Sequence, residues 1–320
     1  MTQGKITFGL IGAASISTTF IDAVSRIDNA EIAAVASKSL DKAREFAEKN
    51  NIPRYYDSYA EMMKSDDIQA VYIATTHNFH YENIMLALSC GKHVLCEKAM
   101  VLTQIEAEAV FAKSRATGLF VMECMWSRFQ PAFREACKWI RDGEIGEIST
   151  ASCQIGFKAP DGGRVLHPDL AGGALYDIGV YAIETIHALI GRDAIDVTSR
   201  LTYPRNDGVD FTDHIILDFG DNITANILCS VYTQNVHKGL TIYGSKGILS
   251  IPDPVNAREI TMTKFTGETR TFAPQKHSNG FIYEIEEAIA CIQAGEIESP
   301  TIPHEDTIHC AWIFDRCKGT

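Results

Sequence analysis

The sequence lacks several patterns that mark common classes of protein. None of its nine cysteines forms a Cys-x-x-Cys pair, which argues against a zinc ribbon and against a thioredoxin-type site. No stretch approaches the ~20 apolar residues of a membrane span. Basic residues number 29 against 41 acidic ones, and the net charge of −12 argues against binding along a nucleic-acid backbone. We therefore expect neither a nucleic-acid nor a membrane partner.

The residues that are present indicate a globular protein with two domains. The 320 residues leave room for two domains of ordinary size, and 46% hydrophobic residues suffice for substantial cores. Scattered, unpaired cysteines are typical of a reducing compartment, so we expect a cytoplasmic protein. The apolar start Ile6–Ala14 is interrupted by Thr7, Gly9 and Gly12, which favours a first core strand over a secretion signal.

The first part of the chain alternates short apolar runs with helical patterns. Ile6–Ile11 is an apolar run that ends at Gly12, and Ser15–Arg26 reads as a helix behind it. Further strands are predicted at Glu31–Ser37, Arg54–Tyr56, Ala70–Thr75, His93–Cys96 and Leu119–Glu123. Repeated βα units with apolar strands imply a parallel sheet covered on both faces. Residues 1–126 are therefore predicted to form an α/β Rossmann domain with a doubly wound parallel sheet.

The pattern changes after Trp126. In Ile223–Val231, apolar residues alternate with mostly polar ones, which is typical of a half-buried antiparallel strand. Similar strands are predicted at 211–219, 239–243 and 259–264, and helices at 131–141, 283–294 and 304–317. Residues 127–320 are therefore predicted to form an α+β domain with a large, mostly antiparallel open sheet.

The turn after the first strand has the position of a dinucleotide-binding loop. Aligned on Gly-x-Gly-x-x-Gly, it supplies Gly12, Ala14 and Ser17, so only the first glycine is kept. It follows the first strand and opens a helix, and small residues there let the backbone approach a pyrophosphate. At the end of the second strand, Ser37 and Lys38 stand where NAD-binding proteins usually place an acid. This favours NADP over NAD, the alternative being a solvated loop lysine.

Three features make the chain resemble the Gfo/Idh/MocA family, which includes glucose–fructose oxidoreductase and inositol dehydrogenase. The opening turn is one of them. The segments Ile73–His80 and Gly91–Lys98 look like the family's strand-four loop and its Glu-Lys-Pro motif. Glu123–Phe129 is similar to a Trp-x-Arg-Phe segment in the branch of dimeric dihydrodiol dehydrogenases and NADP-dependent D-xylose dehydrogenases. The resemblance implies a first domain that binds the cofactor and a second that binds substrate and forms a homodimer through its open sheet face.

The resemblance also implies which residues contact the cofactor. The opening turn would contact the pyrophosphate, and the end of the second strand would contact the adenosine phosphate. The later segments would contact the ribose and the nicotinamide. Trp126 and Arg128 would lie near the carboxamide, with simple packing between domains as the alternative. In chain order, the implied cofactor-binding residues are Gly12, Ala13, Ala14, Ser15, Ile16, Ser37, Lys38, Thr75, Asn78, His80, Glu97, Lys98, Trp126 and Arg128.

The stretch 172–181 supplies the predicted chemistry. Two glycines open a predicted helix, on which Asp177 and Tyr181 are spaced i, i+4 and share one face. The resemblance places Lys98, Asp177 and Tyr181 around the reacting carbon. We hypothesise that Tyr181 exchanges the hydroxyl proton, while Lys98 bonds the substrate oxygen and lowers the pKa of the phenol. Asp177 would orient the substrate or Lys98, or else form an ion pair, and His167 would enter the substrate pocket or remain a loop residue.

The predicted activity is dehydrogenation of a sugar, a polyol or a cyclic trans-diol. No cluster of metal ligands is visible, so we expect no metal. Two alternatives remain: a catalytically silent protein that senses NADP, and an enzyme that uses the nicotinamide transiently to cleave glycosides. Ala99 replaces the proline of Glu-Lys-Pro. Because a cis bond before alanine costs ~2.5–4 kcal/mol, we expect Lys98 to be followed by a trans bond.

Overall fold

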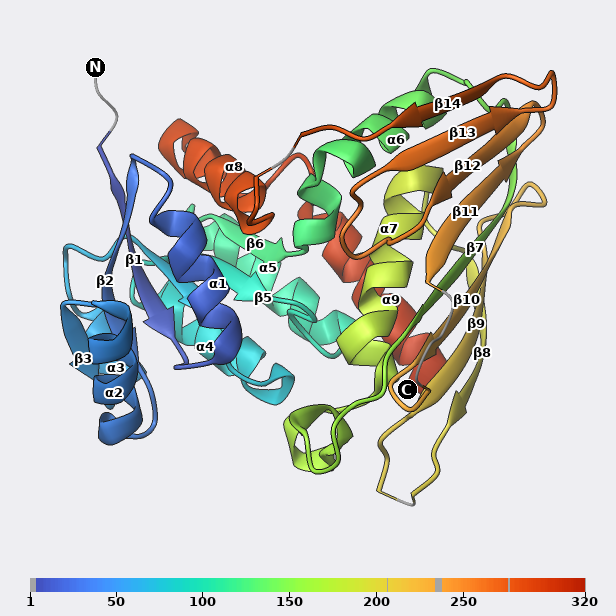
Figure 1. The fold of residues 1–320 in the computed structure, drawn as a ribbon. Helices are drawn as coiled ribbons and strands as arrows, with labels where there is room; N and C mark the ends of the chain where they lie inside the picture. Colours follow the sequence, from blue (N-terminus) through green and yellow to red (C-terminus); the bar gives the residue numbers. More distant parts are fainter. Residues whose placement is uncertain (1–3, 206, 234–237, 276, 320) are drawn as a thin grey trace. The chain divides into compact units, whose positions relative to one another are not determined.

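The computed structural model describes residues 4–205, 207–233, 238–275 and 277–319 (Figure 1). They form two compact units. The first comprises Met1–Val101, Ile105–Trp126 and His277–Thr307, and the second comprises Leu102–Gln104, Ser127–Lys276 and Ile308–Thr320. Among the described residues, the search for a helix of sufficient length and apolar character to cross a membrane found none.

The first unit contains a six-stranded parallel sheet in the order β3-β2-β1-β4-β5-β6. Its strands are β1 (Ile6–Ile11), β2 (Ala30–Ala36), β3 (Arg54–Tyr56), β4 (Ala70–Ile73), β5 (His93–Glu97) and β6 (Val121–Cys124). The order reverses between β1 and β4, which is where ligands of doubly wound sheets bind, outside the carboxyl ends of the strands. The predicted Rossmann fold is confirmed.

The helices of the first unit come from two parts of the chain. They are α1 (Ser15–Val24), α2 (Leu40–Asn50), α3 (Tyr59–Met63), α4 (His80–Ser89), α5 (Gln104–Thr117) and α8 (Phe281–Ala294). Helix α8 packs against α1, although the segment Ser127–Lys276 of the second unit separates it from β6 along the chain. Residues 277–307 therefore belong to the first unit. The sequence did not reveal this, because the apolar face of a helix does not indicate which sheet the helix will cover.

The second unit is built on an eight-stranded sheet in the order β14-β13-β12-β11-β7-β10-β9-β8. Its strands are β7 (Ile148–Gly156), β8 (Asp196–Thr202), β9 (Thr212–Asp218), β10 (Thr224–Ser230), β11 (Gly239–Gly244), β12 (Gly247–Ile251), β13 (Ile260–Lys264) and β14 (Thr269–Phe272). Neighbouring strands are antiparallel except for β7 and β10, which are parallel. The predicted large, mostly antiparallel sheet is confirmed.

Helices cover one face of this sheet. Figure 1 shows α6 (Pro131–Arg141) and α7 (Val180–Ile190) on the same side, and the Cys317 carbonyl near the end of α9 (His304–Lys318) accepts a hydrogen bond from Ser199 of β8. Side chains on the covered face are buried, as at Ile227 of β10. On the other face, Ile216 is 46% and Tyr243 39% exposed. Within the described part of the chain no helix lies on that face.

The segment before α7 differs from the predicted helix. Leu175–Gly179 forms a π-helical turn, and the α-helix begins only at Val180. Single π turns inside helices are frequent at functional sites, and no sequence periodicity predicts one. Asp177 lies in the π turn and Tyr181 in the first turn of α7.

Candidate active site

The turn after β1 brings the Gly12 backbone close to the end of β4. Gly12 has a φ of +104°, and a Cβ atom there would lie 2.9 Å from the Ala74 carbonyl oxygen, so only glycine fits. Helix α1 starts at Ser15, and among the described residues no side chain caps its N-terminus and no acid occupies its first turn. Its first N–H groups therefore favour an anion, and the residues present fit the phosphates of a dinucleotide.

A positive charge lies at the end of β2. The Lys38 ammonium is 3.7 Å from the centre of the Phe79 ring, in the 3-10 turn His77–Phe79 that follows β4. This cation–π contact holds the ammonium beside the switch point of the sheet. The next acid, Asp41, forms an ion pair with Arg44 at 2.8 Å. Phe79 was not predicted from the sequence, because only the fold brings this ring to Lys38.

His80 connects the ends of two strands. It is fully buried, and its ring nitrogens lie 2.9 Å from the Ala99 carbonyl oxygen and 3.0 Å from that of Thr75. The family resemblance implies that Thr75, Asn78 and His80 lie along the cofactor. The structure gathers them at the carboxyl end of β4, where His80 holds backbone and Thr76 donates a 2.7 Å hydrogen bond to the Asn78 side chain.

The expectation of a trans bond after Lys98 is wrong, because the Lys98–Ala99 peptide is cis. The groups that follow Lys98 are fixed from both sides. His80 contacts the Ala99 carbonyl, and the Met100 N–H donates to Glu123 at 2.9 Å. Glu123 also accepts a 2.9 Å bond from the Thr307 hydroxyl. The expectation rested on the general energetic preference for trans bonds, which takes no account of these specific contacts.

Two buried acids, Glu97 and Glu284, influence each other near the end of β5. Glu97, the last residue of β5, accepts a 2.5 Å hydrogen bond from the Tyr72 hydroxyl. Glu284 of α8 is fully buried, and among the described residues neither of its carboxyl oxygens has a hydrogen-bond partner. Burial, and secondarily the charge of Glu97, raises the pKa of Glu284 well above its usual value. Burial therefore favours the protonated form of Glu284, and nothing in the sequence indicated this.

Replacing Glu284 with Met is expected to stabilise the protein, increasingly so as the pH rises. An unfolded glutamate ionises near pH ~4.3, whereas the folded Glu284 keeps its proton to a much higher pH. Stability is therefore lost as the pH rises above ~4.3, and the variant removes this loss. Thermal unfolding at pH 4.5 and pH 8 measures the difference, with exposed Glu286→Met as the control. A gain that is absent or equal at both pH values contradicts the prediction.

In the second unit, Asp177 and Tyr181 are both buried, at 5% and 8% exposure. The Asp177 carboxylate forms a 2.8 Å ion pair with Arg164, whose side chain is half exposed. Arg164 lies in the separate 3-10 turn Arg164–Leu166, so this is not the pairing along one helix that periodicity suggests. The carbonyl of His167 accepts hydrogen bonds from Leu170 and Gly172, which fixes the same loop.

Arg128 is held by an acid of the same unit. Its guanidinium lies 2.7 Å from the Glu184 carboxylate of α7, and the two side chains are 6% and 0% exposed. Trp126 belongs to the first unit, where its ring lies 5.7 Å from that of Phe281 in α8. Lys98 likewise belongs to the first unit. Glu184 and Phe281 were not predicted, because both contacts join elements far apart in the sequence.

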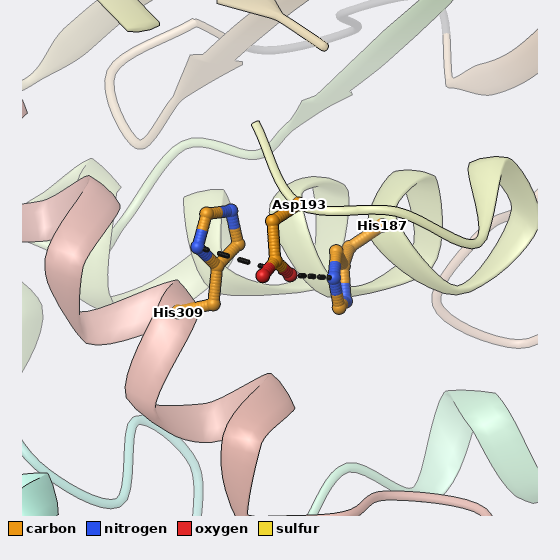
Figure 2. Close-up of side chains that lie close together, drawn as sticks. All are labelled: His187, Asp193 and His309. Atoms are coloured by element: carbon orange, nitrogen blue, oxygen red, sulfur yellow. Dashed lines mark hydrogen bonds and ion pairs between the residues drawn. The ribbon is translucent and has the colours of Figure 1, made fainter. Parts of the chain in front are cut away.

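One cluster has the composition of a metal site. Figure 2 shows His187 of α7, Asp193 of the following loop and His309 of α9, with ligand atoms within 4.8 Å of one another. The Asp193 carboxylate lies 2.9 Å from Nε2 of His187 and 4.0 Å from Nδ1 of His309. However, Nε2 of His309 accepts the Ala194 N–H at 2.9 Å, so Nδ1 of the neutral ring carries a proton and offers no lone pair to a metal. These contacts are better explained as attaching the loop that contains Asp193 and Ala194 to helix α9.

The fold and the carboxyl edge of its first sheet define a dinucleotide-binding class. Residues 6–124 match the model of the oxidoreductase family with an NAD-binding Rossmann fold, and residues 133–250 match the Gfo/Idh/MocA C-terminal domain. The chain is 32% identical to the trans-1,2-dihydrobenzene-1,2-diol dehydrogenase of Bos taurus and 30% identical to that of Mus musculus. In both cases the match covers 98% of this chain and 96% of the relative. The chain belongs to the Gfo/Idh/MocA oxidoreductase family.

Solved structures agree with this assignment. A 3-ketoreductase from Actinomadura kijaniata in complex with NADP and TDP-benzene is 26% identical, with a TM-score of 0.89 over 99% of this chain and 98% of that chain. An aldose-aldose oxidoreductase from Caulobacter crescentus, complexed with glycerol, is 25% identical, with a TM-score of 0.88 over 98% of each chain. The predicted family, fold and class of enzyme are confirmed.

Proposed function

We propose that the protein is an NADP-dependent dehydrogenase that acts on a hydroxyl carbon of a sugar, a polyol or a cyclic trans-diol. The observation that carries this proposal is the edge of the first sheet, where the Gly12 turn, the Lys38 ammonium and Lys98 follow three of its strands. The turn fits a pyrophosphate, and the ammonium suits an additional phosphate on the adenosine ribose. The names of the relatives support the range of substrates.

When bound, a nicotinamide cofactor would supply the hydride chemistry, and the side chains of the protein control the proton. Tyr181 exchanges the hydroxyl proton, and the Lys98 ammonium hydrogen-bonds the substrate oxygen. A nearby ammonium favours the phenolate and so lowers the pKa of a tyrosine from ~10. Asp177 orients the substrate, with its carboxylate held by the 2.8 Å ion pair to Arg164. Such acid–base assistance typically contributes ~10²–10⁴-fold to the rate.

The experiment that tests the activity is a screen of NADP⁺ reduction, followed at 340 nm, with aldoses, polyols and trans-dihydrodiols. We expect NADPH to form with at least one of these classes. Binding of NADPH without turnover of any alcohol would favour the NADP-sensing alternative. Hydrolysis of a glycoside without net formation of NADPH would favour the transient use of the cofactor.

Lys38→Ala tests the cofactor preference. Because the ammonium would pair with the 2′-phosphate, we expect the variant to weaken NADPH binding about 10- to 100-fold and to leave NADH binding unchanged. Dissociation constants from fluorescence titration measure both effects, with Lys49→Ala at the far end of α2 as the control. Tighter binding of NADH than of NADPH by the parent protein, or equal weakening of both by the variant, would rule out this role of Lys38.

We further propose a homodimer in the cytoplasm. The face of the second sheet that exposes Ile216 and Tyr243 would pair with the same face of a second copy, because this contact would remove large apolar side chains from water. The nine cysteines are all free, which suits a reducing compartment. Light scattering at micromolar concentration is expected to give twice the chain mass of 35.3 kDa. A monomer under these conditions contradicts the dimer.

A further inference from the structure

A buried carboxylate holds the start of the helical segment that carries Asp177 and Tyr181. Asp210, which precedes β9, is fully buried. Its Oδ2 atom accepts the Leu175 N–H at 2.7 Å, and its backbone carbonyl accepts the Ala174 N–H at 2.9 Å. Asp210 therefore binds the two N–H groups at the beginning of the π turn, as a capping residue does, from a position 35 residues away.

The glycine pair before the helix permits this approach. Gly173 has a φ of +126°, and a Cβ atom there would collide with the Asp210 carboxylate. A Cβ atom on Gly172 would collide with the Val165 carbonyl oxygen in the loop that also contains Arg164. The two glycines thus admit a carboxylate on one side and a loop backbone on the other. Because no Cβ atom intervenes, the start of the helix lies in direct contact with Asp210.

The charge of Asp210 is balanced from the last turn of α9. The Lys318 ammonium lies 3.1 Å from Oδ1 of Asp210, and its side chain is 20% exposed. Asp213, also fully buried, accepts a 3.6 Å hydrogen bond from the Cys229 thiol. Burial, and then the neighbouring Asp210 carboxylate, raises the pKa of Asp213 to about 9. Because Asp213 in its protonated form adds no second charge beside the ion pair of Asp210 and Lys318, the burial of the group is tolerable.

We propose that Asp210 and Lys318 are positioning residues for the reaction, which act through the backbone of the 174–181 segment on Asp177 and Tyr181. This inference rests on the proposed function. Only Tyr176 lies between Leu175 and Asp177, and the Asp177 N–H donates a 3.2 Å hydrogen bond back to the Gly173 carbonyl. A shift of the first N–H groups is therefore transmitted directly to both side chains. Lys318 thereby helps to set the positions of the Asp177 and Tyr181 side chains.

Lys318→Met tests this proposal by two independent measurements. Hydrogen exchange at the Ala174 and Leu175 amides is expected to become at least about 10-fold faster, because their acceptor loses its counter-charge. The kcat is expected to fall about 10- to 100-fold, as small misplacements of catalytic groups do, with no change in NADPH binding. Lys318→Arg, which keeps the charge, is expected to restore both. Lys264→Met, which removes the ion pairs to Glu144 and Glu268 in the same unit, is the matched control.

The measurements separate this proposal from the proposed function. Hydrogen exchange requires no substrate, so it reports on the helix start even if the parent protein turns over no alcohol, a result that would overturn only the proposed function. Parent-like exchange and kcat in Lys318→Met would overturn the positioning role, and so would a lower melting temperature with an unchanged kcat. If Lys318→Met does not fold, the double variant Asp210→Asn/Lys318→Met removes both charges and is judged by the same two measurements.

Discussion

Tyr181→Phe is expected to lower kcat about 10²- to 10⁴-fold while NADPH binding remains unchanged. The substitution removes only the phenolic oxygen, which in the proposed mechanism takes up and returns the hydroxyl proton. The ring is 8% exposed and keeps its packing, so the fold should be preserved. Single-turnover kinetics with the alcohol that the parent protein oxidises fastest would measure the loss at the chemical step.

The chain supplies a close control for this variant. Tyr176 lies five residues earlier in the same helical segment, is 9% exposed, and donates a 3.4 Å hydrogen bond to the Leu102 carbonyl. Tyr176→Phe removes the same atom from a tyrosine with no assigned chemical role and is expected to change kcat less than about tenfold. Lys98→Met is expected to resemble Tyr181→Phe. Near-parent turnover by Tyr181→Phe or by Lys98→Met would contradict the role assigned to that residue.

Arg128→Met is expected to destabilise the protein by about 3–5 kcal/mol, the largest change in stability that we predict. The substitution leaves the Glu184 carboxylate, which is 0% exposed, without the guanidinium that lies 2.7 Å from it. An unpaired buried charge costs far more than the loss of an exposed ion pair. Calorimetric unfolding measures the effect and also shows whether the two units unfold separately.

Two further variants test the cause of this loss. Arg128→Met/Glu184→Met replaces both charges with apolar side chains, and it is expected to recover most of the lost stability. Lys138→Met removes a pair with Asp142 whose side chains are 57% and 48% exposed, so a change of at most ~1 kcal/mol is expected. If Arg128→Met lowers the free energy of unfolding no more than Lys138→Met does, the buried ion pair of Arg128 and Glu184 does not stabilise the fold in the way described.

The sequence predicts the strands that are buried on both faces most accurately. All six residues of β1 are buried, and its predicted bounds, Ile6–Ile11, agree with the structure. Edge strands are less visible. In β8 exposed and half-buried residues alternate, and three of the four residues of β14 are exposed, so neither presents an apolar run to recognise. The sequence analysis predicted neither strand.

Only the parts of the candidate site that lie in short, continuous sequence motifs could be predicted. The turn at Gly12, the lysine after β2 and the Asp177/Tyr181 spacing are all local, and the sequence displays them. The partners of these residues are not local. Phe79 meets Lys38 because β2 and β4 flank β1, and Asp210 reaches Leu175 only through the folded second unit. Such contacts arise from tertiary structure, on which a single sequence carries no direct information.

The most direct test of the central claim is the transfer of deuterium. An alcohol that the NADP⁺ screen shows to be oxidised is deuterated at its carbinol carbon and incubated with the protein and NADP⁺. We expect mass spectrometry to find the label in NADPH, and we expect a primary isotope effect in the single-turnover rate. Recovery of the deuterium in solvent, with unlabelled NADPH, would contradict hydride transfer between the cofactor and a hydroxyl carbon.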